Sequence, residues 1–281
     1  MISAMTCFGW LEVYPDETYV HFMVNQNING SSGIVSIKDI NTTSPSHKYE
    51  YFSDLVWTST QCNIALGDDS GEIFMASRKD GSGNATICKY ILSPDFSLAS
   101  DIVFCLEFYE LTNAYDILVP YGERVFMVTY EVVFPFWTNF ILFDFSSMTL
   151  VWKNRIVDYT QGNSLRQAID YDPVDNLIYS WHVHSYNSDL LMFILNATTG
   201  NQHGGTYIKF KVQYCIDMSY YNKFLYGIVF SEYSLDNKLL LIVADVSDPN
   251  SLTFTTYQQT TGHPFHSLFV DETTQRLLIG V

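Results

Sequence analysis

The stretch that decides the fold is Asp170-Tyr171-Asp172-Pro173-Val174-Asp175-Asn176-Leu177-Ile178-Tyr179. An apolar run ends in a carboxylate, polar residues that favour turns follow, and a second apolar run begins about seven residues after the acid. This order of residues predicts two short antiparallel strands joined by a tight turn.

The same unit recurs along the chain at intervals of roughly 45 to 63 residues. Its members are Leu11-Glu12-Val13 before Tyr19-Val20; Leu106-Glu107-Phe108 before Ala114-Tyr115; Ile169-Asp170-Tyr171 before Leu177-Ile178-Tyr179; Ile216-Asp217-Met218 before Phe224-Leu225-Tyr226; and Val270-Asp271-Glu272 before Leu277-Leu278-Ile279. Val56-Trp57 before Ile64 holds the same place with an indole instead of an acid. A repeat of this length, built from short strands, predicts a circular or stacked all-β array.

Two further strand-like runs lie between consecutive hairpins, so each unit contains four predicted strands. In the fifth unit they span residues 213–217, 224–230, 239–246 and 252–257, and the breaks between them contain Asn, Asp, Ser or Pro. In the second unit, Asp68-Asp69-Ser70-Gly71 and Asp80-Gly81-Ser82-Gly83 form the predicted hairpin tips. Four antiparallel strands with tight turns, repeated along a chain, are typical of a β-propeller.

The predicted fold is therefore an all-β, single-domain β-propeller over residues 1–281 with about six four-stranded blades. The blades lie near residues 4–53, 54–97, 101–157, 163–212 and 213–260, with a partial blade over 265–281. We expect the sixth blade to be left incomplete by this chain, because only two strands are predicted in it. An exposed blade edge templates aggregation, so we expect missing chain, a protein partner or another copy to cover it.

Two of the hairpins resemble a known group of propellers. Residues 170–179 and 270–279 resemble the Asp-Pro-x-x-Asn-x-Leu-Tyr hairpins of the YWTD, NHL and YVTN groups. The Tyr-Trp-Thr-Asp string itself is absent, and Tyr179-Ser180-Trp181 approaches it. The resemblance implies a propeller that is commonly extracellular and often a protein-binding or scaffold module. It carries no catalytic residue over to this chain.

The charge balance argues against nucleic acid as a partner. The 281-residue chain has 14 Lys and Arg against 30 Asp and Glu, which gives a formal net charge of -16. A charge of this sign repels phosphate backbones and anionic membrane surfaces. The longest apolar stretch, residues 125–145, is interrupted by charged residues, Asn and Pro, so it is predicted to form two strands and no membrane span.

The location of the protein is predicted from glycosylation sequons. No basic segment followed by an apolar run opens the chain, so either the protein is cytoplasmic or the sequence is not the whole precursor. Four Asn-x-Ser/Thr sequons fall at predicted turns or strand ends: Asn29, Asn41, Asn84 and Asn196. Their shared placement favours an extracellular or lumenal glycoprotein, with the cytoplasm as the alternative.

The five cysteines allow one or two disulfides and a leftover thiol. Cys7, Cys105 and Cys215 fall inside apolar strands, so they are interpreted as buried free thiols. Cys62 and Cys88 flank one predicted three-strand segment and are the candidate disulfide, provided that loop geometry brings them within bonding distance.

The recurrent acids Glu12, Glu107, Asp170, Asp217 and Asp271 are the candidate site residues. If they occupy equivalent positions at the ends of inner strands, they surround one mouth of a central channel. One hypothesis is that they bind calcium, since hard cations prefer several oxygen ligands. The other is that each carboxylate accepts N–H groups of its own hairpin turn, and repetition in nearly every unit favours this structural role.

Other chemistry-bearing patterns are sparse. His182 and His184 share a strand face at a spacing that suits a transition metal, but no third ligand is in view. His263 and His266 lie in a loop before the last inner strand, where a histidine near Asp271 could act as a general base. The sequence contains no Gly-x-Ser-x-Gly nucleophile motif and no phosphate-binding glycine loop, so no catalytic residue is predicted.

These observations predict a non-enzymatic binding, adhesion or assembly module without a cofactor. The partner is expected to be a protein or a second copy, engaged through loops or the incomplete blade edge. The alternative is a calcium-dependent propeller hydrolase, similar to the calcium lactonases or regucalcin-like enzymes, with the acids at the channel mouth holding the cation.

Overall fold

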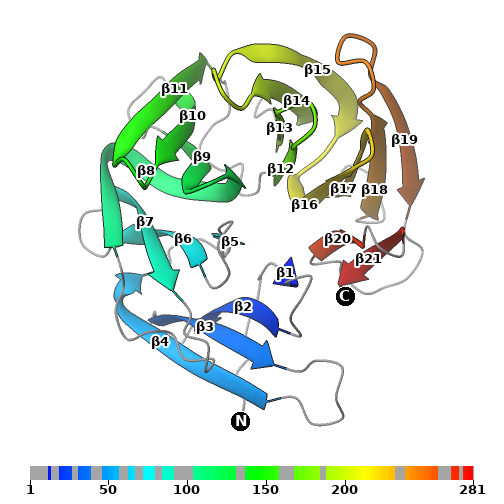
Figure 1. The fold of residues 1–281 in the computed structure, drawn as a ribbon. Helices are drawn as coiled ribbons and strands as arrows, with labels where there is room; N and C mark the ends of the chain where they lie inside the picture. The colour runs from blue at the N-terminus through cyan, green and yellow to red at the C-terminus, as the bar shows by residue number, and fades with distance from the viewer. Residues whose placement is uncertain are drawn as a thin grey trace. The chain divides into compact units, whose positions relative to one another are not determined.

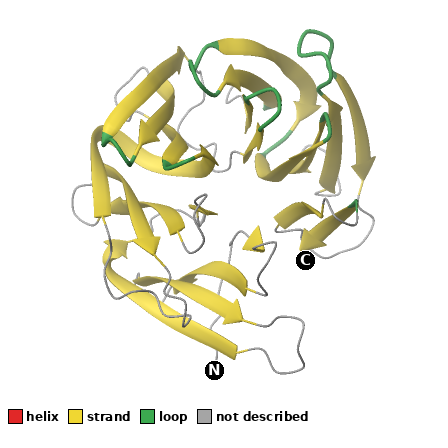
Figure 2. Ribbon diagram, viewed as in Figure 1, coloured by secondary structure: helices red, strands yellow, loops and turns green. Residues whose placement is uncertain are grey.

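The structure of the chain is a computed structural model in which every described element is a β-strand (Figure 1, Figure 2). It describes residues 12–13, 19–26, 31–38, 46–56, 63–66, 72–79, 84–91, 104–130, 137–157, 168–183, 188–231, 238–258, 267–271 and 275–280. Within these ranges there is no helix of the length and hydropathy that crossing a membrane requires. The expected all-β class is confirmed.

The chain divides into two compact units. The first holds residues 1–131 and 143–149, and the second holds residues 132–142 and 150–281. The strands β10 (Trp137–Asp144) and β11 (Thr149–Val157) are both divided by this boundary. Each unit is described by itself below.

In the first unit, hydrogen-bonded strands follow the order β1-β2-β3-β4-β6-β7-β8-β9, with β5 paired to β6. The strands are β1 (Glu12–Val13), β2 (Tyr19–Gln26), β3 (Ser31–Lys38), β4 (Ser46–Val56), β5 (Asn63–Leu66), β6 (Glu72–Lys79), β7 (Asn84–Ile91), β8 (Phe104–Tyr121) and β9 (Arg124–Tyr130). The strand β8 pairs with β7 through its first part and with β9 through its second part.

The second unit contains two four-stranded antiparallel sheets and a two-stranded one (Figure 1). Their orders are β12-β13-β14-β15, β16-β17-β18-β19 and β20-β21. The strands are β12 (Ala168–Asp172), β13 (Leu177–Val183), β14 (Asp189–Asn196), β15 (Gln202–Lys211), β16 (Tyr214–Tyr221), β17 (Phe224–Ser231), β18 (Lys238–Asp245), β19 (Thr253–Gln258), β20 (Ser267–Asp271) and β21 (Arg276–Gly280). The four strands predicted for residues 213–260 are confirmed within two residues at most ends, as are the two strands in residues 125–145.

Burial falls from the inner to the outer strands of these sheets. All seven residues of β13 are buried, whereas five of the six residues of β19 are exposed. A strand buried on both faces needs apolar residues at successive positions, and Leu177-Ile178-Tyr179 supplies them. The core of the unit includes Trp181, which is fully buried. An added methyl group at Gly227 of β17 would lie 2.1 Å from the Trp181 ring, so glycine at this position is what admits the indole.

A turn at the end of the third strand recurs in three places. Asp144, Asn196 and Asp245 each end a strand and accept the N–H of the residue two positions later at 3.0, 3.1 and 3.0 Å. The residue after each of them is buried and donates its N–H to the turn between the first two strands: Phe145 to Glu123 O, Ala197 to Asn176 O, and Val246 to Lys223 O, at 2.9 to 3.0 Å. These side chains replace missing backbone partners at the turn, as Asx residues do.

One predicted hairpin is wrong. The sequence around Leu106-Glu107-Phe108 predicts a turn before Ala114, but β8 runs unbroken from Phe104 to Tyr121. The turn comes later, at Gly122-Glu123, where Gly122 has a φ of 58°. Register shifts between Thr112 and Ala114 absorb the turn-like residues inside the strand pairing, so they bend the strand without ending it.

Candidate functional site

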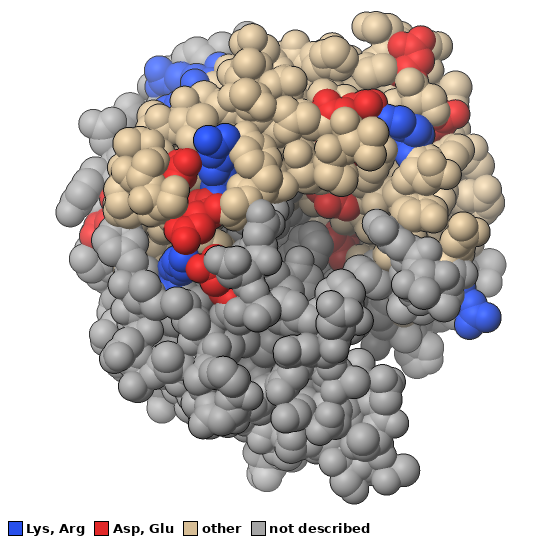
Figure 3. Space-filling model, viewed as in Figure 1, with Lys and Arg blue, Asp and Glu red and all other residues tan. Residues whose placement is uncertain are grey.

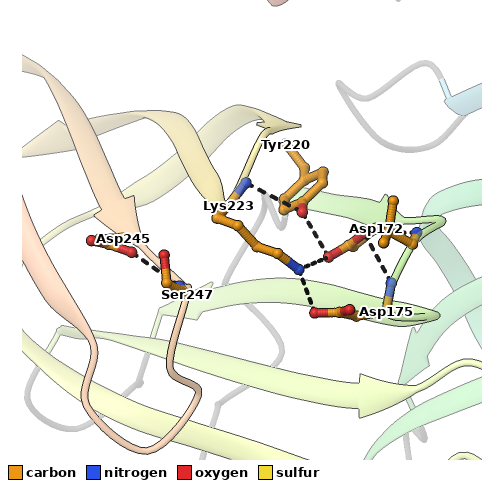
Figure 4. Close-up of polar contacts among 7 residues, drawn as sticks. Asp172, Asp175, Tyr220, Lys223, Asp245 and Ser247 are labelled. Carbon is orange, nitrogen blue, oxygen red and sulfur yellow. Dashed lines mark hydrogen bonds and ion pairs between the residues drawn. The ribbon is translucent and has the colours of Figure 1, made fainter.

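Among the described residues of the second unit, the best-connected group of polar side chains joins the β12–β13 turn to the β16–β17 turn (Figure 4). Asp172 has a side chain with no exposed surface, and its Oδ2 accepts hydrogen bonds from the Tyr220 hydroxyl at 2.6 Å and from Lys223 Nζ at 3.2 Å. Lys223 Nζ also pairs with Asp175, which is half exposed. The other oxygen of Asp172 accepts the N–H groups of Val174 and Asp175 at 2.9 and 3.2 Å. Every oxygen of this buried carboxylate is therefore engaged.

The contacts within this cluster favour the ionised forms of Asp172 and Lys223 and the neutral form of Tyr220. Burial alone would raise the pKa of Asp172, but the bonds from Tyr220, from the two backbone N–H groups and from Lys223 outweigh it and lower that pKa. Burial and the bond to Asp172 raise the pKa of Tyr220 to about 12. The hydrogen bond to Asp175 is the main cause that raises the pKa of Lys223. The cluster is a satisfied ion pair that links two sheets, and none of these pKa values is brought toward neutrality as acid–base catalysis requires.

Two of the predicted acids also link neighbouring sheets. Asp170 on β12 accepts the N–H of Tyr171 at 2.8 Å and that of Tyr220 on β16 at 2.5 Å. Asp217 on β16 accepts the N–H of Met218 at 2.8 Å and that of Leu268 on β20 at 2.6 Å. Their partners are thus the next residue and the following inner strand, and not the hairpin turn that the sequence suggests.

Asp217 is unusual because it is 5% exposed and has no cationic partner among its described contacts. Burial and, to a smaller extent, the nearby Asp170 raise the pKa of its carboxyl to about 8, although the two N–H bonds act in the opposite direction. Both described contacts are to backbone, so the carboxyl holds β16 against β20.

The five predicted acids differ in strand register, although Asp170 and Asp217 make the same pair of contacts. Asp271 lies opposite Arg276 in the last pair before its turn, and Glu12 lies opposite His21. Asp170 lies opposite Tyr179, two residues before the end of its strand. The other two sit deeper: Asp217 pairs with Ile228, four residues before the end of β16, and Glu107 pairs with Thr86 of β7. Within the part of the chain that the structure describes, no three His, Cys, Asp or Glu side chains are grouped as a metal would require.

A second buried ion cluster, in the first unit, was not predicted from the sequence. Lys89 Nζ lies 2.5 Å from Glu72 Oε1 and 2.9 Å from Glu123 Oε1, and both Lys89 and Glu72 are buried. The ammonium group also lies 5.7 Å from the centre of the Phe74 ring. Burial lowers the pKa of Lys89, but the contacts with Glu72 and Glu123 together outweigh it, so that pKa is raised. The charge is compensated, which fits a structural role.

His182 is enclosed by aromatic rings. It has no exposed surface, its Nε2 lies 2.7 Å from Ser180 Oγ, and the rings of Phe140 and Phe193 lie 5.3 and 5.2 Å away. Burial lowers its pKa to about 3, so the imidazole is neutral. Its Nδ1 has no hydrogen-bond partner in the described structure. His184, His263 and His266 lie outside the described residues.

The disulfide differs from the predicted one. Cys88 on β7 bonds to Cys105 on β8, and not to Cys62, which lies outside the described residues together with Cys7. The two cysteines face each other directly in the antiparallel pairing, with Cα atoms 4.1 Å apart. Cys105 is therefore not a free thiol. Cys215 is free and buried, as predicted, and burial raises the pKa of its thiol.

Of the sequons, Asn196 has a described side chain, which caps the β14–β15 turn. Asn84 is the first residue of β7, and Asn29 and Asn41 lie outside the described residues. Acidic and basic side chains are interspersed over the described part of the surface that Figure 3 displays.

The sequence analysis missed the caps at Asp144, Asn196 and Asp245. Their shared sequence signal is an Asx residue, one apolar or small residue, and then Ser or Thr.

The arrangement of strands is similar to that of solved β-propellers. A candidate 6-phosphogluconolactonase from Bacteroides uniformis has a TM-score of 0.63 at 11% identity, over 96% of this chain and 76% of that one. For the β-propeller domain of Cps50 (Swd1) from Myceliophteria thermophila the TM-score is 0.54 at 11% identity, over 90% and 72%. For a chain of the nidogen–laminin complex it is 0.53 at 12% identity, over 93% and 79%.

These likenesses, together with the repeated four-stranded sheets, define the class of protein: the chain has the β-propeller fold that its hairpins predict. The sequence matches no protein-family model and no curated protein. At such low identity the structural likeness extends to the fold alone.

Proposed function

We propose that the protein is a non-enzymatic propeller that acts in the extracellular space or a secretory lumen by assembling with a second copy of itself. The observation that carries the proposal is the outer strand β19, whose six residues, Thr-Phe-Thr-Thr-Tyr-Gln, include no charge, no Pro and no Gly. An uncharged, regular edge strand is a ready template for pairing with another chain. The disulfide between Cys88 and Cys105 supports an oxidising compartment.

Two other described strands that end a sheet, β11 and β15, are protected against such pairing. β11 carries exposed Lys153 and Arg155. β15 contains Gly204-Gly205, exposed Lys211 and register shifts in its pairing with β14. By contrast, β19 follows β18 in an unbroken register from Thr253 to Gln258, and Tyr257 is 56% exposed. Charges and bulges are the usual means of blocking an edge, and β19 has neither.

The chemistry of the strand favours a second copy as its partner. Two copies of β19 that run antiparallel about a two-fold axis place Thr, Tyr and Gln opposite one another, with no like charges in contact. The net charge of -16 makes two copies repel each other. Electrostatic repulsion between them is weakest where an uncharged strand such as β19 meets its own copy. The proposal also includes the two-stranded sheet β20-β21, whose edge can pair with a strand of the second copy.

The experiment is sedimentation velocity over a dilution series of the full chain. We expect a dimer that dissociates on dilution, and at least a tenfold weaker association for both Thr255→Lys and Thr255→Glu. Either sign disrupts a two-fold interface because each charge meets its own copy. The matched controls His203→Lys and His203→Glu, on the exposed part of β15, should associate like the wild type. A wild-type monomer at all concentrations, or unaffected Thr255 variants, would refute the proposal.

The competing hypothesis of a calcium-dependent hydrolase is tested by thermal unfolding with and without millimolar calcium. A cation that binds the folded state alone raises the unfolding temperature. We expect no rise, since both oxygens of Asp170 and of Asp217 are bonded to backbone N–H groups. A calcium-dependent rise that Asp217→Asn abolishes would favour the hydrolase instead.

A further inference from the structure

The β14–β15 turn holds a sequon whose folded geometry uses one atom of the asparagine side chain and leaves another unused. Asn196 Oδ1 accepts three hydrogen bonds, from Thr198 N at 3.1 Å, Thr199 N at 2.9 Å and Thr199 Oγ1 at 3.1 Å. Among the described contacts, none involves Asn196 Nδ2. The side chain is partly exposed, and Thr198 and Thr199 beside it are exposed.

Comparison with the equivalent turns shows that the fold requires only the oxygen. Asp144 and Asp245 hold the same place and cap their turns through Oδ1, so an acid performs the structural task. Neither of these turns has an amide nitrogen at this position. The amide of Asn196 therefore has no structural explanation, although the residue as an oxygen acceptor does.

We propose that Asn196 Nδ2 carries an N-linked glycan, an inference that rests on the secretory location in the proposed function. The donor class is a lipid-pyrophosphate-linked oligosaccharide. The amide nitrogen forms a bond to the anomeric carbon of the first sugar and loses one proton. The bond from that carbon to the pyrophosphate oxygen breaks, and the lipid pyrophosphate leaves with the electron pair. No oxidation or reduction takes place.

The folded turn accommodates the product. Glycosylation leaves Oδ1 as a carbonyl oxygen, so all three hydrogen bonds of the cap remain available. In the fold, the exposed Thr198 Oγ1 accepts a bond of 2.7 Å from Asn176 Nδ2, and its own O–H remains free to donate. Trp152 also stabilises the turn, because its Nε1 donates a hydrogen bond to Ala197 O at 2.9 Å.

The test uses the full chain secreted from a eukaryotic cell line behind a cleavable leader. Peptide N-glycosidase in ¹⁸O-water converts each occupied asparagine to a labelled aspartate, which peptide mass spectrometry locates. We expect the label at position 196, and its loss in Asn196→Asp and in Thr198→Val. Thr198→Ser should keep it. When both proteins are produced without glycosylation, Asn196→Asp should unfold at the same temperature as the wild type, since Asp caps the equivalent turns at Asp144 and Asp245.

The outcomes separate this site from the proposed location. If Asn29, Asn41 or Asn84 is labelled and Asn196 is not, the inference is wrong and the secretory location stands. If the secreted protein and the protein from its native source carry no label at any sequon, both are wrong.

Discussion

The two four-stranded sheets of the second unit share one architecture and differ in almost every residue that carries chemistry. Both have the strand order first to fourth, a cap at the end of the third strand, and a buried second strand. Yet β12-β13-β14-β15 buries a neutral histidine, His182, and a carboxylate paired with a lysine, Asp172, whereas β16-β17-β18-β19 buries a carboxyl with no described cationic partner, Asp217. Their outer edges also differ, since β15 is interrupted and β19 is regular. The repeat therefore conserves turn geometry and core shape, and leaves charge and edge chemistry free to vary.

The sheets differ most where they touch. Trp181 of β13 fills the space above Gly227 of β17, so one sheet supplies the largest buried side chain and the other supplies no side chain at all. A repeat with equal residues at both places would either overlap or leave a cavity. Complementary sizes at this contact are thus part of what makes the two sheets distinct.

The largest expected effect comes from breaking this complementarity. Trp181→Ala should lower the free energy of unfolding by about 3 to 5 kcal/mol, because it leaves a cavity in the core. Gly227→Ala should cost about 1 to 3 kcal/mol, because its methyl group would overlap the indole. Denaturant titration followed by circular dichroism measures both values.

A double-mutant cycle sharpens the same comparison. In a Trp181→Phe background the smaller ring makes room, so Gly227→Ala should cost less than it does in the wild type. The matched control is Gly122→Ala, where no atom lies within 4 Å of the added methyl and the cost arises from the φ of 58° alone. That control should show no coupling to Trp181→Phe. Additive costs for Gly227 and Trp181 would contradict the contact.

The sequence predicts those elements whose determinants are local. The hairpin around Asp172-Pro173 could be predicted because turn residues and apolar runs adjoin each other in the chain, and the strands of residues 213–260 follow for the same reason. The continuous strand β8 was missed, because its turn-like residues are absorbed by register shifts against β9. Local propensity is overridden there by pairing with a neighbour.

Most of the candidate site could not be predicted, because its contacts join residues about 50 positions apart. Tyr220 and Lys223 meet Asp172 only once two sheets are packed, and no spacing rule in the sequence links them. The Cys88–Cys105 disulfide was not predicted either, because it depends on the register of β7 against β8, which the sequence spacing does not give. The recurrent acids suggested equivalence by sequence spacing, but strand register placed Asp170 and Asp217 at different depths.

The smallest expected effect in the wild type, where two opposing contributions cancel, separates the two sheets by their response to pH. The pKa of His182 is about 3 in the folded chain and ordinarily 6.5. Between these pH values the unfolded chain binds a proton at this residue that the folded chain does not bind. Stability from this group is lost as the pH falls from 6.5 toward 3. Asp217 has a folded pKa of about 8 against 3.8, so the folded chain keeps a proton that the unfolded chain has released. Stability from that group is lost as the pH rises from about 4 toward 8.

Between pH 4 and 6.5 the two slopes oppose each other, each at most about 1.4 kcal/mol per pH unit, so the wild type should change little through them. Single variants expose each slope: His182→Gln should become less stable with rising pH across this window, and Asp217→Asn more stable. Unfolding midpoints measured in urea at several pH values give both signs. Because the double variant lacks both groups, it should regain the flat profile, and a slope that persists in it would assign the pH dependence to other residues.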